Sequence, residues 1–297
     1  MSAARQLDLF AVAAPVAMPE PRLRLVPPLS FAPSRVSFFL GAHRPHWLGL
    51  SPHSLFVSHN TLKNRKSFPR AVAPWALDSG AFTEISQHGH HRMTAAAYAR
   101  RVELYQREIG LLAFASQQDW MCEPVVLAKT GLSIEEHQRR TIDNYLELCS
   151  IAPSVPWMPV LQGWCGGDHL EHVEQYARRG IDLRKCERVG VGSICRRQGT
   201  IRAGLILLDV ALTAGIRVHA FGLKANGLVE SNLARMVSCD SMAWSTHERK
   251  KHAALLSQYR ALGRAHELPR TGGQNKLACA VDWYHSVIAP RLGGASC

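Results

Sequence analysis

The amino-acid sequence predicts an α/β protein built on a closed (β/α)8 TIM-like barrel, with a disordered N-terminal tail and C-terminal helices. From Val36 onward, short apolar runs of strand length alternate with amphipathic stretches of helical length, which is the pattern of parallel βαβ units. About eight such runs fall within roughly 230 residues, close to the size of a barrel of eight strands. A doubly wound open sheet is the second interpretation of the same pattern.

Capping residues mark where the predicted helices begin and end. Ser133 opens an S-x-x-E box with Glu136, which satisfies free amides at a helix start. Gly110, Gly180 and Gly215 each follow a helical stretch, where a left-handed residue ends a helix. The predicted strands are 37–42, 54–58, 75–80, 111–116, 157–163, 189–193, 218–223 and 236–242, and the predicted helices are 94–109, 133–150, 168–180, 199–214, 226–235, 246–265 and 274–290.

Three segments differ in character along the chain. Residues 1–35 form a predicted disordered tail, because 11–34 hold six prolines and no periodicity, and proline removes donors and resists helix. Residues 36–250 form the predicted barrel. Residues 251–297 form a predicted C-terminal helical appendage packed outside it.

Composition narrows the class of protein. The chain has 297 residues, 46% of them hydrophobic and 20% charged, which excludes a fully disordered, collagen-like or coiled-coil protein. No stretch is apolar for about 18 residues and no secretory leader is readable. The eight cysteines are scattered without a C-x-x-C pair, which is typical of reduced thiols. We therefore expect a cytoplasmic protein without a membrane association.

The net charge of +12 indicates a polyanionic partner, because Lys and Arg supply most nonspecific affinity for nucleic acids. A host whose proteins are generally rich in arginine is the alternative explanation.

Polar residues follow the predicted strands at the end where a parallel barrel collects its chemistry. Each has an ordinary structural explanation, since an Asp after a strand often caps the next helix and a Gly serves a turn. Their occurrence at successive strand ends favours a functional site instead. They are Asp78, Asp119, Gln162 with Gly163, Gly192, Phe221 with Gly222, and Asp240.

This set of side chains suits glycosidic chemistry on a purine. Paired carboxylates can attack an anomeric carbon and manage protons around an oxocarbenium-like transition state. A carboxylate also accepts from paired N–H groups, and an amide both donates and accepts. Phe82 and Phe221 offer faces on which a planar base can stack.

The same segments resemble the tRNA-guanine transglycosylase superfamily, and most of all its DNA-acting branch, the deazapurine DNA-modification (DpdA-like) proteins. The stretches WALDSGAFTE, QQDWMCEP, VLQGW, VGVGSICRRQ and CDSMAW carry the resemblance. It covers about residues 36–250, and the motifs are specific only as a set. The resemblance implies a (β/α)8 barrel and a pentosyltransferase that exchanges guanine in DNA for a preQ0-like 7-deazaguanine base.

The resemblance also implies roles for single residues. Asp240 would be the nucleophile that forms a covalent glycosyl–enzyme ester, and Asp78 would manage protons. Asp119 would bind N1–H and the exocyclic amine of guanine. The other substrate-binding positions are Phe82, Gln162, Gly163, Gly192, Phe221 and Gly222. Candidate phosphate contacts are Lys63, Arg65, Lys66, Arg196, Arg197 and Lys224, although solvated surface charge explains each of these singly.

No cofactor is expected. The tRNA enzymes carry C-x-C-x2-C with a downstream His as a zinc site, and this chain has none; Cys279, His285 and Cys297 lack metal-ligand spacing. The same exchange on tRNA, a non-catalytic nucleic-acid-binding barrel and a simple nucleosidase remain the alternatives.

The first residues contain a short motif of their own. Gln6, Leu7, Asp8, Leu9 and Phe10 resemble the peptide with which bacterial replication and repair proteins dock on the DNA sliding clamp, while an incidental amphipathic end is the alternative. A clamp tether would concentrate the enzyme on DNA. Helper DNA-modification proteins are a further expected class of partner.

Overall fold

The computed structural model describes residues 36–193, 214–264, 266 and 276–293. Their strands form one sheet in which every neighbouring pair is parallel, in the order β5-β4-β3-β2-β1-β9-β8-β7-β6. The strands are β1 (Ser37–Ala42), β2 (Leu55–Ser58), β3 (Trp75–Asp78), β4 (Leu112–Ser116), β5 (Trp157–Met158), β6 (Val160–Leu161), β7 (Val189–Val191), β8 (Val218–Ala220) and β9 (Met236–Ser241).

The sheet closes because β5 and β6 are the two halves of one strand. They are separated by Pro159 alone; β5 pairs with β4, and β6 pairs with β7. Proline has no N–H to donate and a fixed φ, so it interrupts a strand. Its carbonyl still accepts a hydrogen bond from Gly190 N at 2.8 Å. The predicted eight-stranded (β/α)8 barrel is thereby confirmed, with its fifth strand broken in the middle.

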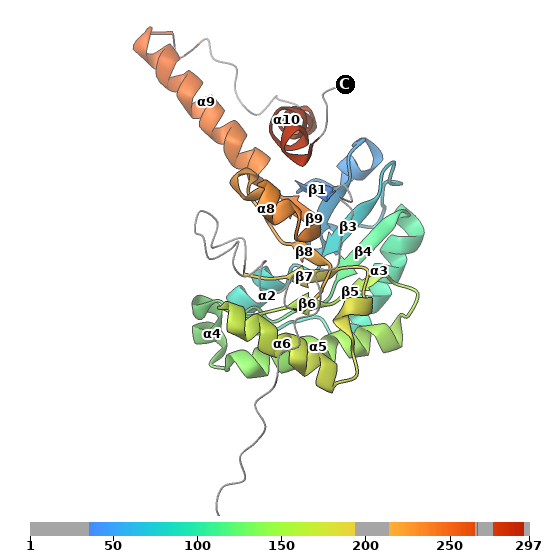
Figure 1. Ribbon diagram of the computed structural model, residues 1–297. Coiled ribbons are helices and arrows are strands. Elements are labelled where there is room, and N and C mark those ends of the chain that lie inside the picture. The colour runs from blue at the N-terminus through green and yellow to red at the C-terminus, as the bar shows by residue number, and fades with distance from the viewer. Residues whose placement is uncertain (1–35, 194–213, 265, 267–275, 294–297) are drawn as a thin grey trace, which may run out of the picture.

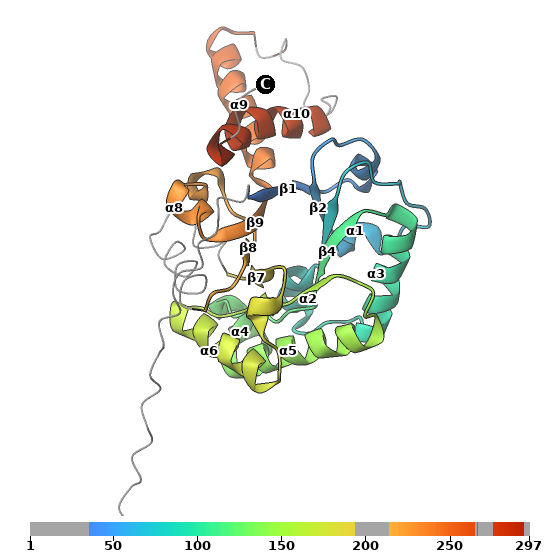
Figure 2. The same cartoon turned by 45° about the vertical axis from the view of Figure 1, so that its right-hand side comes forward.

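Helices surround the barrel on its outside (Figures 1 and 2). The principal ones are α2 (Ala81–His88), α3 (Ala95–Ile109), α4 (Pro124–Thr130), α5 (Ile134–Ile151), α6 (Gly166–Arg178), α9 (Ala243–Ala261) and α10 (Lys276–Trp283), with single turns at α1 (His59–Leu62) and α8 (Glu230–Leu233). The predicted cap is present, since Ser133 Oγ accepts from Glu136 N at 3.1 Å. Gly110 and Gly180 have positive φ, as a helix stop requires.

The prediction of helices was incomplete in places. It did not include α2 and α4, whose seven or eight residues are too few to show a clear period. The helix predicted for 226–235 is a 3-10 turn (Ala225–Gly227) followed by the single turn α8. The helix predicted for 199–214 lies outside the described residues except for its last position. No described helix has the length and apolar character that a membrane span requires.

Side chains of the strands pack on both faces of the barrel sheet. Inside it, Phe39, Phe114 and Met158 pack together, and the rings of Phe39 and Phe114 meet edge-to-face at 5.2 Å. Alternate residues such as Phe38 and Leu40 point outward into the larger layer between strands and helices, as the two-residue period of a strand requires. The interior is therefore a packed core, and chemistry is confined to the ends of the strands.

The C-terminal helices pack beside β1. Trp244 of α9 is buried and donates from Nε1 to Gly41 O at 2.8 Å, while Phe38 contacts Trp283 with ring centroids 6.2 Å apart. The helix predicted for 274–290 is α10 followed by a π-turn (Tyr284–Ile288) and a 3-10 turn that contains Pro290. Helix α9 runs across residue 250. The domain boundary predicted at that residue stays a prediction.

Candidate active site

The predicted polar residues gather at the carboxyl ends of the strands. Asp78 ends β3 and is in register with Ser58 of β2, while Asp240 lies in β9 in register with Phe39 of β1. Asp119 follows β4, and Gln162 follows β6. Six strands therefore bring the predicted carboxylates, amide and glycines to one mouth, as the barrel interpretation requires.

Asp240 is held by the neighbouring strand β8 and the turn after it. It is 5% exposed, and its Oδ1 accepts from Gly222 N at 2.8 Å. The same oxygen lies 3.4 Å from Nε2 of His219. His219 is fully buried and its Nδ1 lies 2.9 Å from Ser238 Oγ; burial lowers the pKa of this imidazole. The backbone amide of Gly222 thus orients the carboxylate, and a neutral imidazole lies beside it.

Asp78 is a carboxyl group whose surroundings favour the protonated form. Burial raises the pKa of Asp78, hydrogen bonds from the Ser58 side chain and the Gly80 backbone oppose that shift, and the charge of Asp240 adds to it. A carboxyl group whose pKa is raised in this way can exchange protons with a substrate nearer neutral pH.

Asp119 forms a buried pair with Gln162. The Asp119 side chain accepts a hydrogen bond from Gln162 Nε2. Burial raises the pKa of Asp119 to about 7, its own backbone amide and the Gln162 bond oppose the shift, and the charge of Asp78 adds to it. Both protonation states of Asp119 are therefore populated near neutrality.

Among the described residues, every polar group of Gln162 except its side-chain Oε1 has a hydrogen-bond partner. Its backbone N–H donates to His172 Nδ1 at 2.8 Å, and its carbonyl accepts from Gln138 Nε2 at 2.8 Å. Its side-chain Oε1 is buried without a hydrogen-bond partner among the described residues. The amide presses against Gly192, where a Cβ would lie only 2.5 Å from Nε2. The next residue, Ser193, is 4% exposed and has φ +62°, a strained conformation of the kind often found at functional sites.

The two predicted aromatic residues differ in their settings. Phe221 lies at the end of β8, where its ring meets His219 edge-to-face at 4.9 Å and presses on Gly190. Phe82 lies in the first turn of α2 and is 39% exposed. Phe221 is thus part of the wall above the barrel interior, and Phe82 lies on the rim.

Gly163 has a packing role in the structure. A Cβ there would lie 2.7 Å from Asp168 Cβ and 2.8 Å from His169 Nδ1, both on α6. Glycine is required because α6 approaches the end of β6 closely.

The predicted phosphate contacts are dispersed. Lys63 donates to Asn60 Oδ1 at 2.7 Å and lies 3.3 Å from Glu84. Arg65, Lys66 and Lys224 are exposed. Arg196, Arg197 and the tail residues 6–10 lie outside the described residues.

Two contacting residues were missed at the sequence level. His219 reaches Asp240, and Ser58 bonds Asp78. The sequence could have indicated His219, because it lies two positions before Phe221 and therefore on the same face of the predicted strand. Ser58 carried no signal, because only the register of β2 with β3 brings it beside Asp78.

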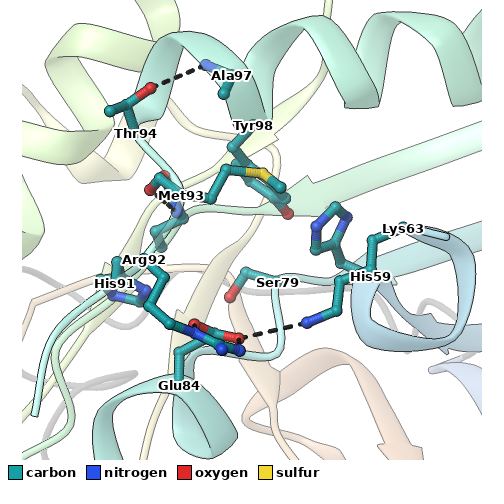
Figure 3. Close-up of a pocket in the computed structure, with 11 residues that line it drawn as sticks. His59, Lys63, Ser79, Glu84, His91, Arg92, Met93, Thr94, Ala97 and Tyr98 are labelled. Atoms are coloured by element: carbon teal, nitrogen blue, oxygen red, sulfur yellow. Dashed lines mark hydrogen bonds and ion pairs between the residues drawn. The ribbon is translucent and has the colours of Figure 1, made fainter. Parts of the chain in front are cut away.

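A side pocket of about 410 Å³ adjoins this site (Figure 3). It lies between α3 and the turns that follow β3 and β4. Its lining residues are His59, Lys63, Ser79, Glu84, His91, Arg92, Met93, Thr94, Ala97, Tyr98 and Gln118. Within the described part of the chain, no group of three or more His, Cys, Asp or Glu is arranged to hold a metal ion.

The fold and the site define a class of protein: a (β/α)8 barrel whose mouth gathers three carboxylates, one of them paired with a buried amide. Residues 34–261, most of the chain, match the family DpdA, DeoxyPurine in DNA protein A, and the chain therefore belongs to this family. The family makes it a transglycosylase-type enzyme of DNA modification, with DNA as its substrate. No protein with a curated function matches the chain.

Proposed function

We propose that the protein exchanges guanine in DNA for a 7-deazaguanine base through a covalent intermediate on Asp240. The observation that carries the proposal is the hydrogen bond from Gly222 N that orients the Asp240 carboxylate, with His219 Nε2 3.4 Å away, at the same mouth as the Asp119–Gln162 pair. Asp240 is placed to attack a sugar carbon, and the Asp119–Gln162 pair is placed to bind a base.

The reaction has two displacements at C1′ of the deoxyribose. In the first, a carboxylate oxygen of Asp240 forms a bond to C1′, the bond from C1′ to N9 breaks, and guanine leaves with that electron pair and a proton from Asp78. In the second, N9 of the incoming base attacks C1′, the ester to Asp240 breaks, and the N9 proton passes to Asp78. The raised pKa of Asp78 suits it to both transfers.

Base recognition follows from the Asp119–Gln162 pair. The carboxylate of Asp119 accepts from N1–H and the exocyclic amine of guanine, and Gln162 Nε2 donates to O6. Adenine would present an unprotonated N1 to the carboxylate, so it is rejected. Phe221 supports one face of the base, and Phe82 on the rim covers the other.

A target base in a duplex must first leave the stack, which costs a few kcal/mol. The excess of positive charge on the chain offsets part of that cost through phosphate contacts. We expect Arg65, Lys66, Arg196, Arg197 and Lys224 among these contacts.

The test is nucleoside mass spectrometry on DNA and tRNA from cells supplied with 7-cyano-7-deazaguanine. The cells express the wild-type protein, Asp240→Asn, or the control Asp143→Asn, which changes a surface carboxylate of α5. We expect a 7-deazaguanine deoxynucleoside in DNA with the wild type and the control alone. A mark found only in tRNA, or one that persists with Asp240→Asn, would reject the proposal.

A further inference from the structure

We propose that the side pocket binds the nucleotide adjoining the target guanosine in the same DNA strand. This inference rests on the proposed function and adds a second subsite to it. The pocket would hold that neighbour while the target base occupies the mouth, so the enzyme would grip two successive nucleotides.

The place of the pocket relative to the reacting carboxylates supports this role. Ser79 follows Asp78 directly and Gln118 precedes Asp119 directly, and both line the pocket. Asn60 connects the two regions, because its Nδ2 donates to Gly80 O at 3.4 Å and its Oδ1 accepts from Lys63 Nζ at 2.7 Å. The wall of the pocket and the carboxylates Asp78 and Asp119 therefore belong to the same two turns, which follow β3 and β4.

The walls of the pocket suit a planar base. Met93, Ala97 and Tyr98 supply much of the lining, and the space of about 410 Å³ falls within the usual range of ligand sites. Met93 is positioned by its carbonyl, which accepts from Gln118 Nε2 at 2.9 Å. A methionine wall stacks on any base with little sequence preference, because its thioether is polarizable and adaptable.

A neutral, buried imidazole forms part of the wall. His59 is 5% exposed; its Nδ1 lies 3.2 Å from Tyr105 OH, and its Nε2 has no partner among the described residues. Burial, together with the charges of Lys63 and Arg101, lowers the pKa of His59 to about 4, so the ring is neutral. Figure 3 shows this ring grouped with Ser79 and Met93 around one space.

The rim of the pocket has an excess of positive charge. Arg92 donates to both oxygens of Glu84 at 2.9 Å, and Lys63 lies 3.3 Å from the same carboxylate. Two cations thus surround one anion. Arg92 is 52% exposed, and a phosphate at the rim can draw on it and on Lys63 while Glu84 keeps both in place.

The experiment uses short single-stranded DNA with one guanine, which removes the cost of opening a duplex. The nucleotide on the 5′ side or the 3′ side of the guanine is replaced by an abasic spacer, one side at a time. For the wild-type protein we expect one spacer to lower kcat/KM for guanine exchange roughly tenfold, chiefly through KM, because one stacked base is lost. The other spacer should change it little.

Variants of the pocket residues test whether the pocket causes the effect of the abasic spacer. Met93→Ala and Arg92→Gln should each lower kcat/KM for exchange on the intact strand. In Met93→Ala, the abasic spacer should change kcat/KM much less than in the wild type. Arg139→Gln is the matched control, since Arg139 makes the same two-bond pair with Glu136 on α5 and is 53% exposed. This control should behave as the wild type.

A binding measurement separates this inference from the proposed function. The dissociation constants of Asp240→Asn protein for the three strands, measured by fluorescence anisotropy, need no chemistry. Equal affinity for intact and abasic strands would overturn the pocket assignment even if exchange occurs. A spacer effect that Met93→Ala removes would support it even if exchange fails, and the failure of exchange with the intact strand counts against the proposed function alone.

Discussion

The side chains of Gln162 and Asp119 are joined by a hydrogen bond from Gln162 Nε2 to the Asp119 carboxylate. Gln162 Oε1, in contrast, is buried without a partner among the described residues. The amide therefore occupies the place on Asp119 that we assign to a guanine N–H. In the proposed reaction, binding of the base moves this amide from the carboxylate to O6, which exchanges one buried hydrogen bond for several.

The first prediction concerns the pH dependence of base binding. The pKa of Asp119 is about 7, and only the ionised carboxylate accepts from both N–H groups of guanine. We expect KM for the incoming base to rise as pH falls through 7, while Asp119→Asn shows a high KM without this dependence. Steady-state exchange assays between pH 5.5 and 8.5 measure it. A wild-type KM that is constant over this range would contradict the role of Asp119.

The second prediction concerns stability. The pKa of Asp119 rises from 3.8 unfolded to about 7 folded, so the folded protein binds more protons between these values and loses stability as pH rises through them. At pH 8 the buried carboxylate is ionised at a cost of up to about 4 kcal/mol. Asp119→Asn should therefore raise Tm at pH 8 and change it little at pH 4, measured by calorimetry with Asp143→Asn as the control. Equal effects at both pH values would refute this.

The third prediction tests the contact between Gly192 and Gln162. A Cβ on residue 192 would overlap the Gln162 amide, so Gly192→Ala should displace that amide from the base site. We expect KM for the base to rise about tenfold, because the hydrogen bond from Gln162 Nε2 to O6 is lost. Gly167→Ala is the control, since a Cβ there has only Cys165 Sγ at 3.8 Å. Similar KM values for the two variants would show that Gly192 has no part in positioning the amide.

The sequence predicted the barrel because its strands are separate apolar runs, each followed by a helix or a turn. Asp78, Asp119 and Asp240 could be assigned to one mouth for the same reason: parallel strands in a closed barrel end on the same side. The break at Pro159 was visible as a proline, but only the pairing of β5 with β4 and β6 with β7 shows that it leaves the barrel closed.

Contacts between side chains of distant segments were not predictable. Gly163 was predicted to bind substrate, which stays a prediction, and its close contact with α6 was not predicted. The side pocket depends on how the segment containing Met93 folds back over His59 and Tyr98, which no local pattern encodes. Such contacts depend on register and loop path, whereas the sequence encodes chiefly period and capping.

The fourth prediction concerns the N-terminal motif. Leu9 and Phe10 would fill an apolar pocket on the DNA sliding clamp, and Gln6 would anchor the peptide by hydrogen bonds. The intact chain should be retained by immobilised clamp, and the variant Leu9→Ala/Phe10→Ala should lose most of this retention. Exchange on short oligonucleotides should be the same for both, since the motif acts by local concentration. Equal retention of the two proteins would reject the motif.

The fifth prediction separates positioning from chemistry at the nucleophile. His219 Nε2 lies 3.4 Å from Asp240 Oδ1, and in the proposed mechanism His219 is a positioning residue because it would act through that carboxylate. His219→Phe keeps a ring within the cluster of Phe56, Phe114 and Phe221 but removes the polar contact.

We expect this variant to lower kcat by roughly ten- to a hundredfold, since a misplaced reactive group costs about that much, with little change in KM for DNA. Trapping of the covalent protein–DNA species should slow in parallel, measured by denaturing gel after rapid mixing. His219→Gln, whose amide restores an N–H group near Oδ1, should recover part of the rate. A loss confined to KM, or equal rates for the Phe and Gln variants, would mean that His219 supports only the packing of the barrel interior.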